Sequence, residues 1–219
     1  DAISGVAAPR IVRRDDEFLV YLIADDAQTA ADAMTAVRIV NRVASTERGG
    51  RRVRLVVAAP GAEAADRSTV VSIPFADPRG LVGQCDAVLA PKAKAASETL
   101  GVAALAFSCR LPIIAPDEGS IHELSTLDGR TAGVAPALDG RDVLDVDRMA
   151  AAILRYLRDF KLYEAHCDLA GAVFDARFRI ERAAAVCSEA YLHARDFVVF
   201  RRDDRPVHAL PGRSREASR

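Results

Sequence analysis

Two short segments of the chain combine residue types that bind anions. Residues 91–101 read PKAKAASETLG, and residues 116–123 read PDEGSIHE. Lysine ammonium groups neutralise phosphate, and the free N–H groups at the start of a helix donate hydrogen bonds to phosphate oxygens. The Gly119-Ser120 pair opens a predicted helical turn, where a residue without Cβ leaves room for a close backbone approach. Both segments are therefore candidate anion-binding loops.

The two lysines of the first segment stand out in this chain. Of 30 basic residues only three are lysines, and Lys92 and Lys94 are two of them. They could supply positive charge to a ligand, or they could be solvated surface residues. Glu98 falls in the first turn of the next predicted helix, after a possible Ser97 cap. There a carboxylate gains about 0.3–1 kcal/mol from the helix dipole alone.

The elements that position these loops alternate along the chain. Short apolar runs of strand length are separated by segments with helical spacing, which indicates βαβ units and a doubly wound parallel sheet. The predicted strands are 18–24, 53–58, 70–73, 87–90, 113–115 and 131–134, and the predicted helices between them are 27–45, 78–84, 97–109 and 120–124. Helices 145–158, 160–175 and 178–194 are expected to follow. Ligands of such sheets bind beyond the carboxyl ends of the strands, where both candidate loops fall.

The composition excludes several classes of protein. The chain has 219 residues, of which 50% are hydrophobic and 28% charged, and its net charge is -1. These values are typical of a globular domain and disfavour a nucleic-acid partner that relies on bulk positive charge. No apolar run approaches the roughly 20 residues of a transmembrane segment, and no signal peptide opens the sequence. A soluble, cytoplasmic protein is expected.

The cysteines and histidines give weak signals. Cys85, Cys109, Cys167 and Cys187 form no C-x-x-C pair. Three disulfide pairings are arithmetically possible, but we expect four reduced thiols that pack as small apolar side chains. No zinc site is predicted, and His122 is interpreted as a surface residue rather than a phosphate ligand. Neither a dinucleotide-binding nor a P-loop glycine motif occurs.

A family resemblance rests on two motifs. Glu98-Thr-Leu-Gly101 and the segment LPIIAPDEGSIHEL of residues 111–124 resemble the C-terminal half of group 1 glycosyltransferases with the GT-B fold. That family has an E-x-F-G segment before a helix, followed by a strand, a Gly-rich loop and a helix. Ser4-Gly-Val6 resembles its linker, and Phe174-x-x-x-Phe178-x-x-Glu181 resembles its closing helix pair. The resemblance covers residues 3–194.

The resemblance implies a lobe that binds a nucleotide-sugar donor without a metal ion or other cofactor. The implied binding residues are Glu98, Thr99, Leu100, Gly101, Gly119 and Ser120, and Lys92 and Lys94 are added as candidates because of their charge. Glu98 would bind sugar hydroxyls, and backbone N–H groups near Gly101 and Gly119-Ser120 would bind the diphosphate. The implied domains are a linker (1–16), a Rossmann-like domain (17–194) and a partly disordered extension (195–219). The N-terminal GT-B domain, which would bind an unknown acceptor, is expected to be missing, so the isolated chain should be inactive.

Three departures from the family pattern support an alternative function. Asp25 and Asp26 occupy the loop where the family usually has Arg and Lys, and two carboxylates would repel a diphosphate. The second Glu of the family's E-x7-E pattern, which binds ribose, is Ala106 or Leu105 here, and Arg110 replaces a Gly. A lobe that has lost donor binding and serves as a structural or interaction module is therefore the second hypothesis. An unrelated flavodoxin-like or response-regulator domain is disfavoured by the terminal helices.

Overall fold

The computed structural model of the chain describes residues 10–24, 26–47, 50–57, 69–72, 78–94 and 97–181, together with Ala184 and Ser188. Contacts divide the chain into two compact units, residues 1–178 and residues 179–219. The elements reported below all belong to the first unit. The predicted helix 178–194 lies largely outside the described residues.

A six-stranded parallel sheet forms the centre of the first unit, in the order β3-β2-β1-β4-β5-β8. Its strands are β1 (Glu17–Leu22), β2 (Arg52–Val57), β3 (Val70–Ser72), β4 (Ala87–Leu89), β5 (Ile113–Ile114) and β8 (Gly133–Val134). On one side of β1 lie β2 and then β3, and on its other side lie β4, β5 and β8. This is the doubly wound, Rossmann-like arrangement, so the predicted fold class is confirmed.

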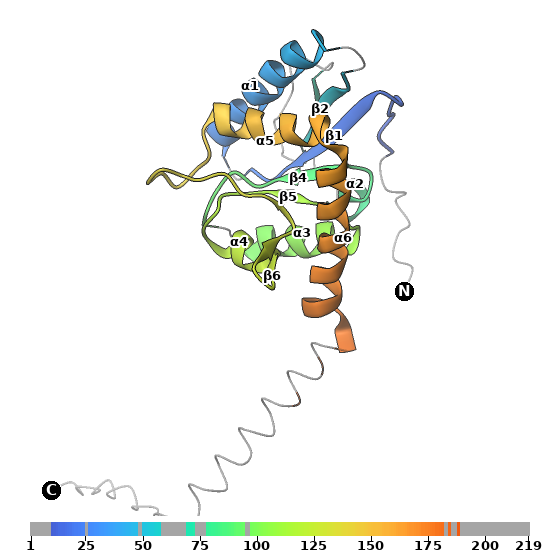
Figure 1. Ribbon diagram of the computed structural model, residues 1–219, viewed down its shortest axis with the longest axis vertical. Coiled ribbons are helices and arrows are strands. Elements are labelled where there is room, and N and C mark those ends of the chain that lie inside the picture. Colours follow the sequence, from blue (N-terminus) through green and yellow to red (C-terminus); the bar gives the residue numbers. More distant parts are fainter. Residues whose placement is uncertain are drawn as a thin grey trace, which may run out of the picture. The chain divides into compact units, whose positions relative to one another are not determined.

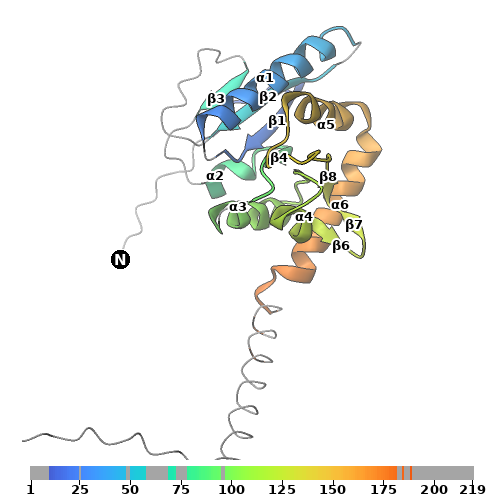
Figure 2. The same ribbon diagram turned by 90° about the vertical axis from the view of Figure 1, so that its left-hand side faces the viewer.

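Helices cover both faces of this sheet (Figure 1). They are α1 (Ala27–Ala44), α2 (Pro78–Val82), α3 (Ser97–Ser108), α4 (Ser120–Ser125), α5 (Val146–Arg158) and α6 (Phe160–Arg177). Figure 2 shows α1 and α5 together on one side and α2, α3 and α4 on the other. From the end of α5, α6 continues toward α3, against which it packs.

The two faces of β1 supply both halves of the core. Phe18 and Val20 pack in the cluster that contains α1 and α5, whereas Leu19 and Tyr21 pack in the cluster that contains α2, α3 and α6. All six residues of β1 are buried. A continuous apolar run is typical of a strand covered on both faces, and the structure confirms that interpretation of residues 18–22.

The predicted strand 131–134 is wrong in detail. Thr131 belongs to a separate antiparallel hairpin of β6 (Thr126–Leu127) and β7 (Arg130–Thr131), and only Gly133 and Val134 join the main sheet as β8. The hairpin turns at Asp128 and Gly129, whose φ angles are 51° and 74°. Two left-handed residues in an Asp-Gly pair form a tight hairpin turn, so this pair is the sequence signal of the hairpin.

The exposed Arg110 occupies the position at which the family has Gly, and its backbone explains that preference. Its φ is 57°, in the left-handed region that favours glycine after a helix. The Arg110 side chain forms an ion pair with Asp168 and lies over Gly171 of α6, where an added Cβ would come 3.2 Å from Arg110 Nε. Arginine therefore links α3 to α6 at the cost of a strained backbone. Near this contact the Phe178 ring stacks on Phe107 at 6.1 Å.

The cysteines follow the prediction only in part. Cys85 is buried, Cys167 is partly buried and Cys109 is exposed; all three are free thiols. Burial raises the pKa of the Cys85 thiol to about 12, so this side chain stays protonated and acts as a small apolar group. The expectation that all four cysteines are buried is wrong for Cys109. Cys187 lies outside the described residues.

A histidine on α6 forms a pH-dependent contact with α5. His166 Nδ1 forms a hydrogen bond with the Tyr156 hydroxyl at 3.0 Å, with the two rings edge to face. Burial, and next the positive charges of Arg155 and Arg130, lower the pKa of His166. Burial also raises the pKa of Tyr156, so the neutral forms of both groups are favoured in the fold.

We therefore expect His166 to make folding stability fall as the solution is acidified. An unfolded histidine titrates near pH 6.5, and between that value and the lower folded pKa the unfolded chain binds more protons. The free energy of unfolding then rises with pH across this interval and is highest above it. His166→Gln should reduce the decrease in melting temperature between about pH 7 and pH 5. An unchanged decrease in the variant would show that His166 does not contribute.

Candidate functional site

The candidate site lies where the strand order of the sheet reverses. β1 and β4 are neighbours there, and the chain leaves their carboxyl ends in opposite directions, toward α1 and α3. Ile23 N–H donates to the Leu89 carbonyl at 2.9 Å, which keeps the two strand ends together. In an open parallel sheet this reversal creates a crevice beyond the strand ends, where ligands bind.

An ion pair crosses this point. Lys92 Nζ, in the loop after β4, lies 2.7 Å from Asp26 Oδ2, in the loop after β1. Asp26 also caps α1, because its Oδ1 accepts from Thr29 N–H at 2.7 Å and its Oδ2 accepts from the Thr29 hydroxyl at 2.8 Å. The hydrogen bond from Lys92, followed by those from Thr29, holds the pKa of Asp26 well below its usual range.

This ion pair changes the charge balance expected from the sequence. Asp26 is not an unpaired acid, since it caps a helix and binds Lys92, and the Lys92 charge is matched by a carboxylate within the chain. The expectation that Lys92 offers its charge to a ligand, while Asp26 repels one, is therefore incomplete. Asp25 lies outside the described residues.

The other predicted residues of the first loop occupy different environments. Lys94 is exposed, and Thr99 and Leu100 are partly buried, with Leu100 packed against the core. Glu98 lies in the first turn of α3, as predicted. Gly101 is the fifth residue of α3, beyond the four positions whose N–H groups a helix leaves free. Its N–H is thus poorly placed for the diphosphate role expected of it.

The second predicted loop touches the first through Gly119. Its backbone has φ 89° and ψ -178°, and a Cβ built on it would lie 2.1 Å from the Ala93 carbonyl oxygen. The space that the sequence suggested for an anion is filled on this side by the chain itself. Gly119 precedes α4, and the partly buried Ser120 begins that helix. The structure thus brings Lys92, Gly119 and Ser120 to one edge of the sheet.

A third segment, which the sequence did not indicate, holds the first loop in place. Lys92 and Val143 form an antiparallel bridge, in which Ala93 N–H donates to Asp142 O at 3.0 Å and Leu144 N–H donates to Pro91 O at 2.9 Å. The segment reaches this position after a tight turn at residues 139–140, where φ is 51° and 78°. The Asp-Gly pair at this turn was the available sequence signal.

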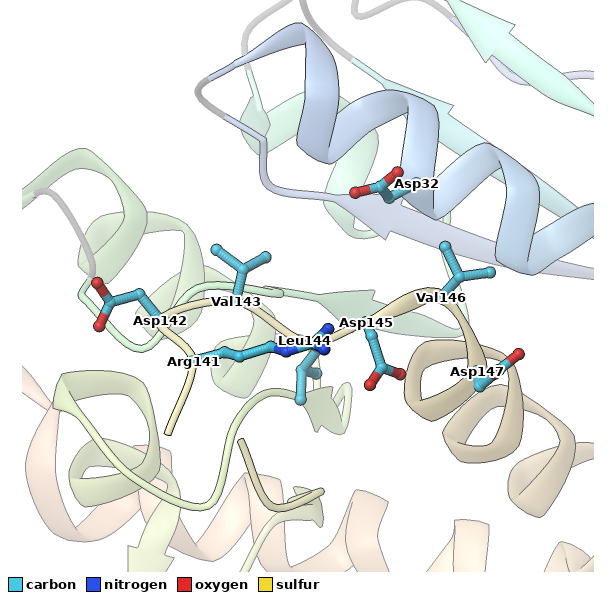
Figure 3. A pocket seen from close by; sticks show the side chains of 8 residues that line it. All are labelled: Asp32, Arg141, Asp142, Val143, Leu144, Asp145, Val146 and Asp147. Carbon is cyan, nitrogen blue, oxygen red and sulfur yellow. The ribbon is translucent and has the colours of Figure 1, made fainter. Parts of the chain in front are cut away.

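This third segment also lines an open pocket beside the predicted site. The pocket has a volume of about 630 Å³, and Figure 3 shows Asp32 on α1 above the run of chain that leads into α5. Its lining residues are Asp32, Arg141, Asp142, Val143, Leu144, Asp145, Val146 and Asp147. Four carboxylates against one guanidinium make its lining acidic, and none of the eight predicted binding residues lines it. This pocket is therefore poorly suited to a diphosphate.

The residues at the family's ribose position belong to the core. Ala106 is fully buried and Leu105 is partly buried against the same cluster, so whichever residue aligns with the ribose glutamate, no carboxylate is present there. His122 Nδ1 is buried without a hydrogen-bond partner, on α4. Among the described residues, no three acidic, His or Cys side chains are placed to hold a metal ion. Within the same ranges, no helix combines the length and apolarity of a membrane span.

Comparison with known proteins defines the fold class. No protein-family model matches the sequence, and no curated protein matches it. Solved structures do match, and among them are glycosyltransferases with the GT-B fold. The chain has the fold of the C-terminal lobe of such an enzyme, as the resemblance predicted.

Three solved structures illustrate this likeness. The GtfA/B complex matches with a TM-score of 0.63 at 13% identity, over 82% of this chain and 36% of that one. The C-terminal domain of a group 1 family glycosyl transferase, LpcC from Francisella tularensis, matches with a TM-score of 0.54 at 14% identity, over 74% of this chain and 87% of that one. HepE from Anabaena, in complex with UDP and glucose, matches with a TM-score of 0.57 at 16% identity, over 81% of this chain and 49% of that one. The chain spans about a third of the length of the GtfA/B match and of pneumococcal GtfA.

Proposed function

We propose that the chain is the donor-binding lobe of a glycosyltransferase that moves a sugar from a nucleotide-sugar to an acceptor. The observation that carries this proposal is the meeting of the loops after β1, β4 and β5 where the strand order reverses. This is the place where an open parallel sheet binds its ligands. The fold shared with glycosyltransferases, among them one crystallised with UDP and glucose, supports the same function.

The roles of individual residues follow from their places. Lys92 and Lys94 supply positive charge beside the crevice, and Glu98, in the first turn of α3, is assigned to the sugar hydroxyls on the family resemblance. Gly119 and Ser120 present backbone N–H groups at the start of α4. The acceptor and the catalytic groups are assigned to an N-terminal GT-B domain across a cleft. No metal ion is included in this proposal, because the family resemblance implies a donor site without one.

A second function is favoured by two specific observations. Asp26 already binds Lys92, and a buried alanine or a partly buried leucine takes the place of the ribose glutamate. Both features weaken the interactions available to a nucleotide. They support a glycosyltransferase-like lobe that has lost donor binding and acts as a structural or interaction module.

Nucleotide binding by the chain separates the two functions. In the first, a thermal-shift series with UDP, GDP, ADP and their sugar conjugates at low salt should give a shift for one nucleotide. A ligand at about 100 times its dissociation constant adds roughly 2.7 kcal/mol to stability. Lys94→Ala should weaken binding of that nucleotide about five- to tenfold, because a charged contact to phosphate is lost. Lys161→Ala removes an exposed lysine from α6 and should have no effect.

Sugar transfer tests the proposal in a protein that contains both domains. Glu98→Gln should abolish transfer, because the carboxylate is assigned to the sugar hydroxyls, while lowering the free energy of unfolding by no more than the roughly 0.3–1 kcal/mol that a first-turn carboxylate gains from the helix dipole. Normal transfer by this variant would remove the role given to Glu98. Absence of a thermal shift with every nucleotide, together with absence of transfer, would favour the module.

A further inference from the structure

The contact between Asp26 and Lys92 has the geometry of an occupied phosphate contact. A lysine ammonium that reaches across the strand reversal is bound by an oxyanion at 2.7 Å, and that oxyanion belongs to the chain itself. The Lys92 side chain is 31% exposed and the Asp26 side chain is 41% exposed, so both are accessible to a ligand. A nucleotide diphosphate placed in this crevice would meet the same ammonium group.

We propose that Asp26 is an internal competitor for the diphosphate, which binds Lys92 in the empty site and thereby sets the affinity for nucleotide diphosphates. The inference rests on the proposed function, because it takes a diphosphate as the ligand of this edge of the sheet. Binding must separate Asp26 from Lys92 and must tolerate the Asp26 carboxylate beside the phosphates. The first effect applies to any ligand that binds Lys92 through a phosphate, and the second grows with the negative charge of the ligand, so a nucleoside without phosphate is not affected.

The Asp26 carboxylate is held in its position beside Lys92 by hydrogen bonds from Thr29. Thr29 holds both of its carboxylate oxygens, through a backbone N–H at 2.7 Å and a hydroxyl at 2.8 Å. The carboxylate therefore cannot swing away without uncapping α1, and helix caps contribute typically about 1 kcal/mol. The backbone of Lys92 is also fixed, since it pairs with Val143. A diphosphate can therefore displace Asp26 from Lys92 only if the lysine side chain moves.

The test neutralises Asp26 and keeps its cap. Asn is as good a helix cap as Asp, so Asp26→Asn should fold normally, and Asp26→Ser is a second cap without charge. We expect about tenfold tighter binding of inorganic pyrophosphate and of UDP, because loss of an exposed ion pair and removal of a like charge each contribute roughly threefold. Uridine should bind equally to both proteins. Asp32→Asn makes the same charge change further along α1 and is the matched control.

The three lysines allow the contact to be followed directly. Reductive methylation with a 13C label keeps the lysine charge and gives one NMR signal set for each of Lys92, Lys94 and Lys161, assigned with Lys→Arg variants. The Lys92 signal should shift in Asp26→Asn without any ligand, and it should respond to pyrophosphate at about tenfold lower concentration than in the wild type. The gain should shrink at high salt, as screening weakens exposed charges.

The outcomes distinguish this inference from the function on which it rests. Equal affinities of the wild type and Asp26→Asn for pyrophosphate would overturn the proposal that Asp26 competes with the diphosphate. If UDP binds both proteins equally, the inference fails and the donor-binding function stands. If pyrophosphate shows the gain while no nucleotide binds, the competitor is supported and the donor-binding function fails. If neither pyrophosphate nor any nucleotide binds any variant, both fail.

Discussion

Gly119→Ala is expected to lower the free energy of unfolding by about 3 kcal/mol or more and to remove the nucleotide binding proposed for the strand reversal. Two separate costs add here. The backbone angles φ 89° and ψ -178° lie in a region essentially reserved for glycine, which costs about 1–3 kcal/mol for another residue. The new Cβ would also lie 2.1 Å from the Ala93 carbonyl oxygen, so the loop that carries Lys92 must move.

Gly140→Ala is the matched control for this variant. Its φ of 78° is also in the left-handed region, but no atom lies within 4 Å of a built Cβ. It should therefore cost only about 1 kcal/mol, from the backbone alone. Urea unfolding of both variants measures the difference. Equal losses would mean that the contact between Ala93 and Gly119 carries no energy, and unchanged nucleotide binding in Gly119→Ala would show that this contact does not position the site.

Gly119 and Gly140 have similar backbone angles but different surroundings, and only the structure reveals the surroundings. The sequence therefore predicts part of the candidate site. Residue type and spacing indicated that Gly119 and the lysines lie at the carboxyl edge of the sheet, because strand and helix periodicity locates the loops. The same sequence did not reveal what fills the space beside Gly119 or what faces Lys92. Those contacts depend on residues far along the chain, such as Ala93 and Asp26, and on the exact separation of two loops.

The fold was more predictable than the site, for a physical reason. Each strand and helix of the sheet is specified locally by an apolar run or by helical spacing, and an alternation of the two has few right-handed solutions. The prediction was wrong at Thr131, where an Asp-Gly turn of two residues redirects the chain. It also missed the segment around Val143, which a short bridge to Lys92 joins to the first loop. Short pairings of this kind leave no periodic pattern.

A single polar side chain, Asn41, connects α1 to β2 through hydrogen bonds. Asn41 on α1 forms two hydrogen bonds with the backbone of Val53 on β2: Asn41 Nδ2 donates to the Val53 carbonyl at 2.9 Å, and Val53 N–H donates to Asn41 Oδ1 at 2.7 Å. On the side opposite β1, the described residues of β3 pair with β2 from Leu55 to Val57. The Asn41 amide binds both backbone groups of Val53, for which the described part of β3 provides no partner.

Asn41→Ala should therefore lower the free energy of unfolding by about 2–3 kcal/mol, because two backbone groups beside a buried strand lose their partners at once. Asn41→Asp keeps an acceptor for Val53 N–H but places a carboxylate against the Val53 carbonyl, so it should not rescue the loss. Gln28→Ala, which removes the exposed bond to Asp32 on the same helix, should cost less than about 0.5 kcal/mol. Urea unfolding gives the three values, and hydrogen exchange should show lost protection of the Val53 amide in Asn41→Ala. Retained protection would mean that α1 and β2 are held together by apolar packing alone.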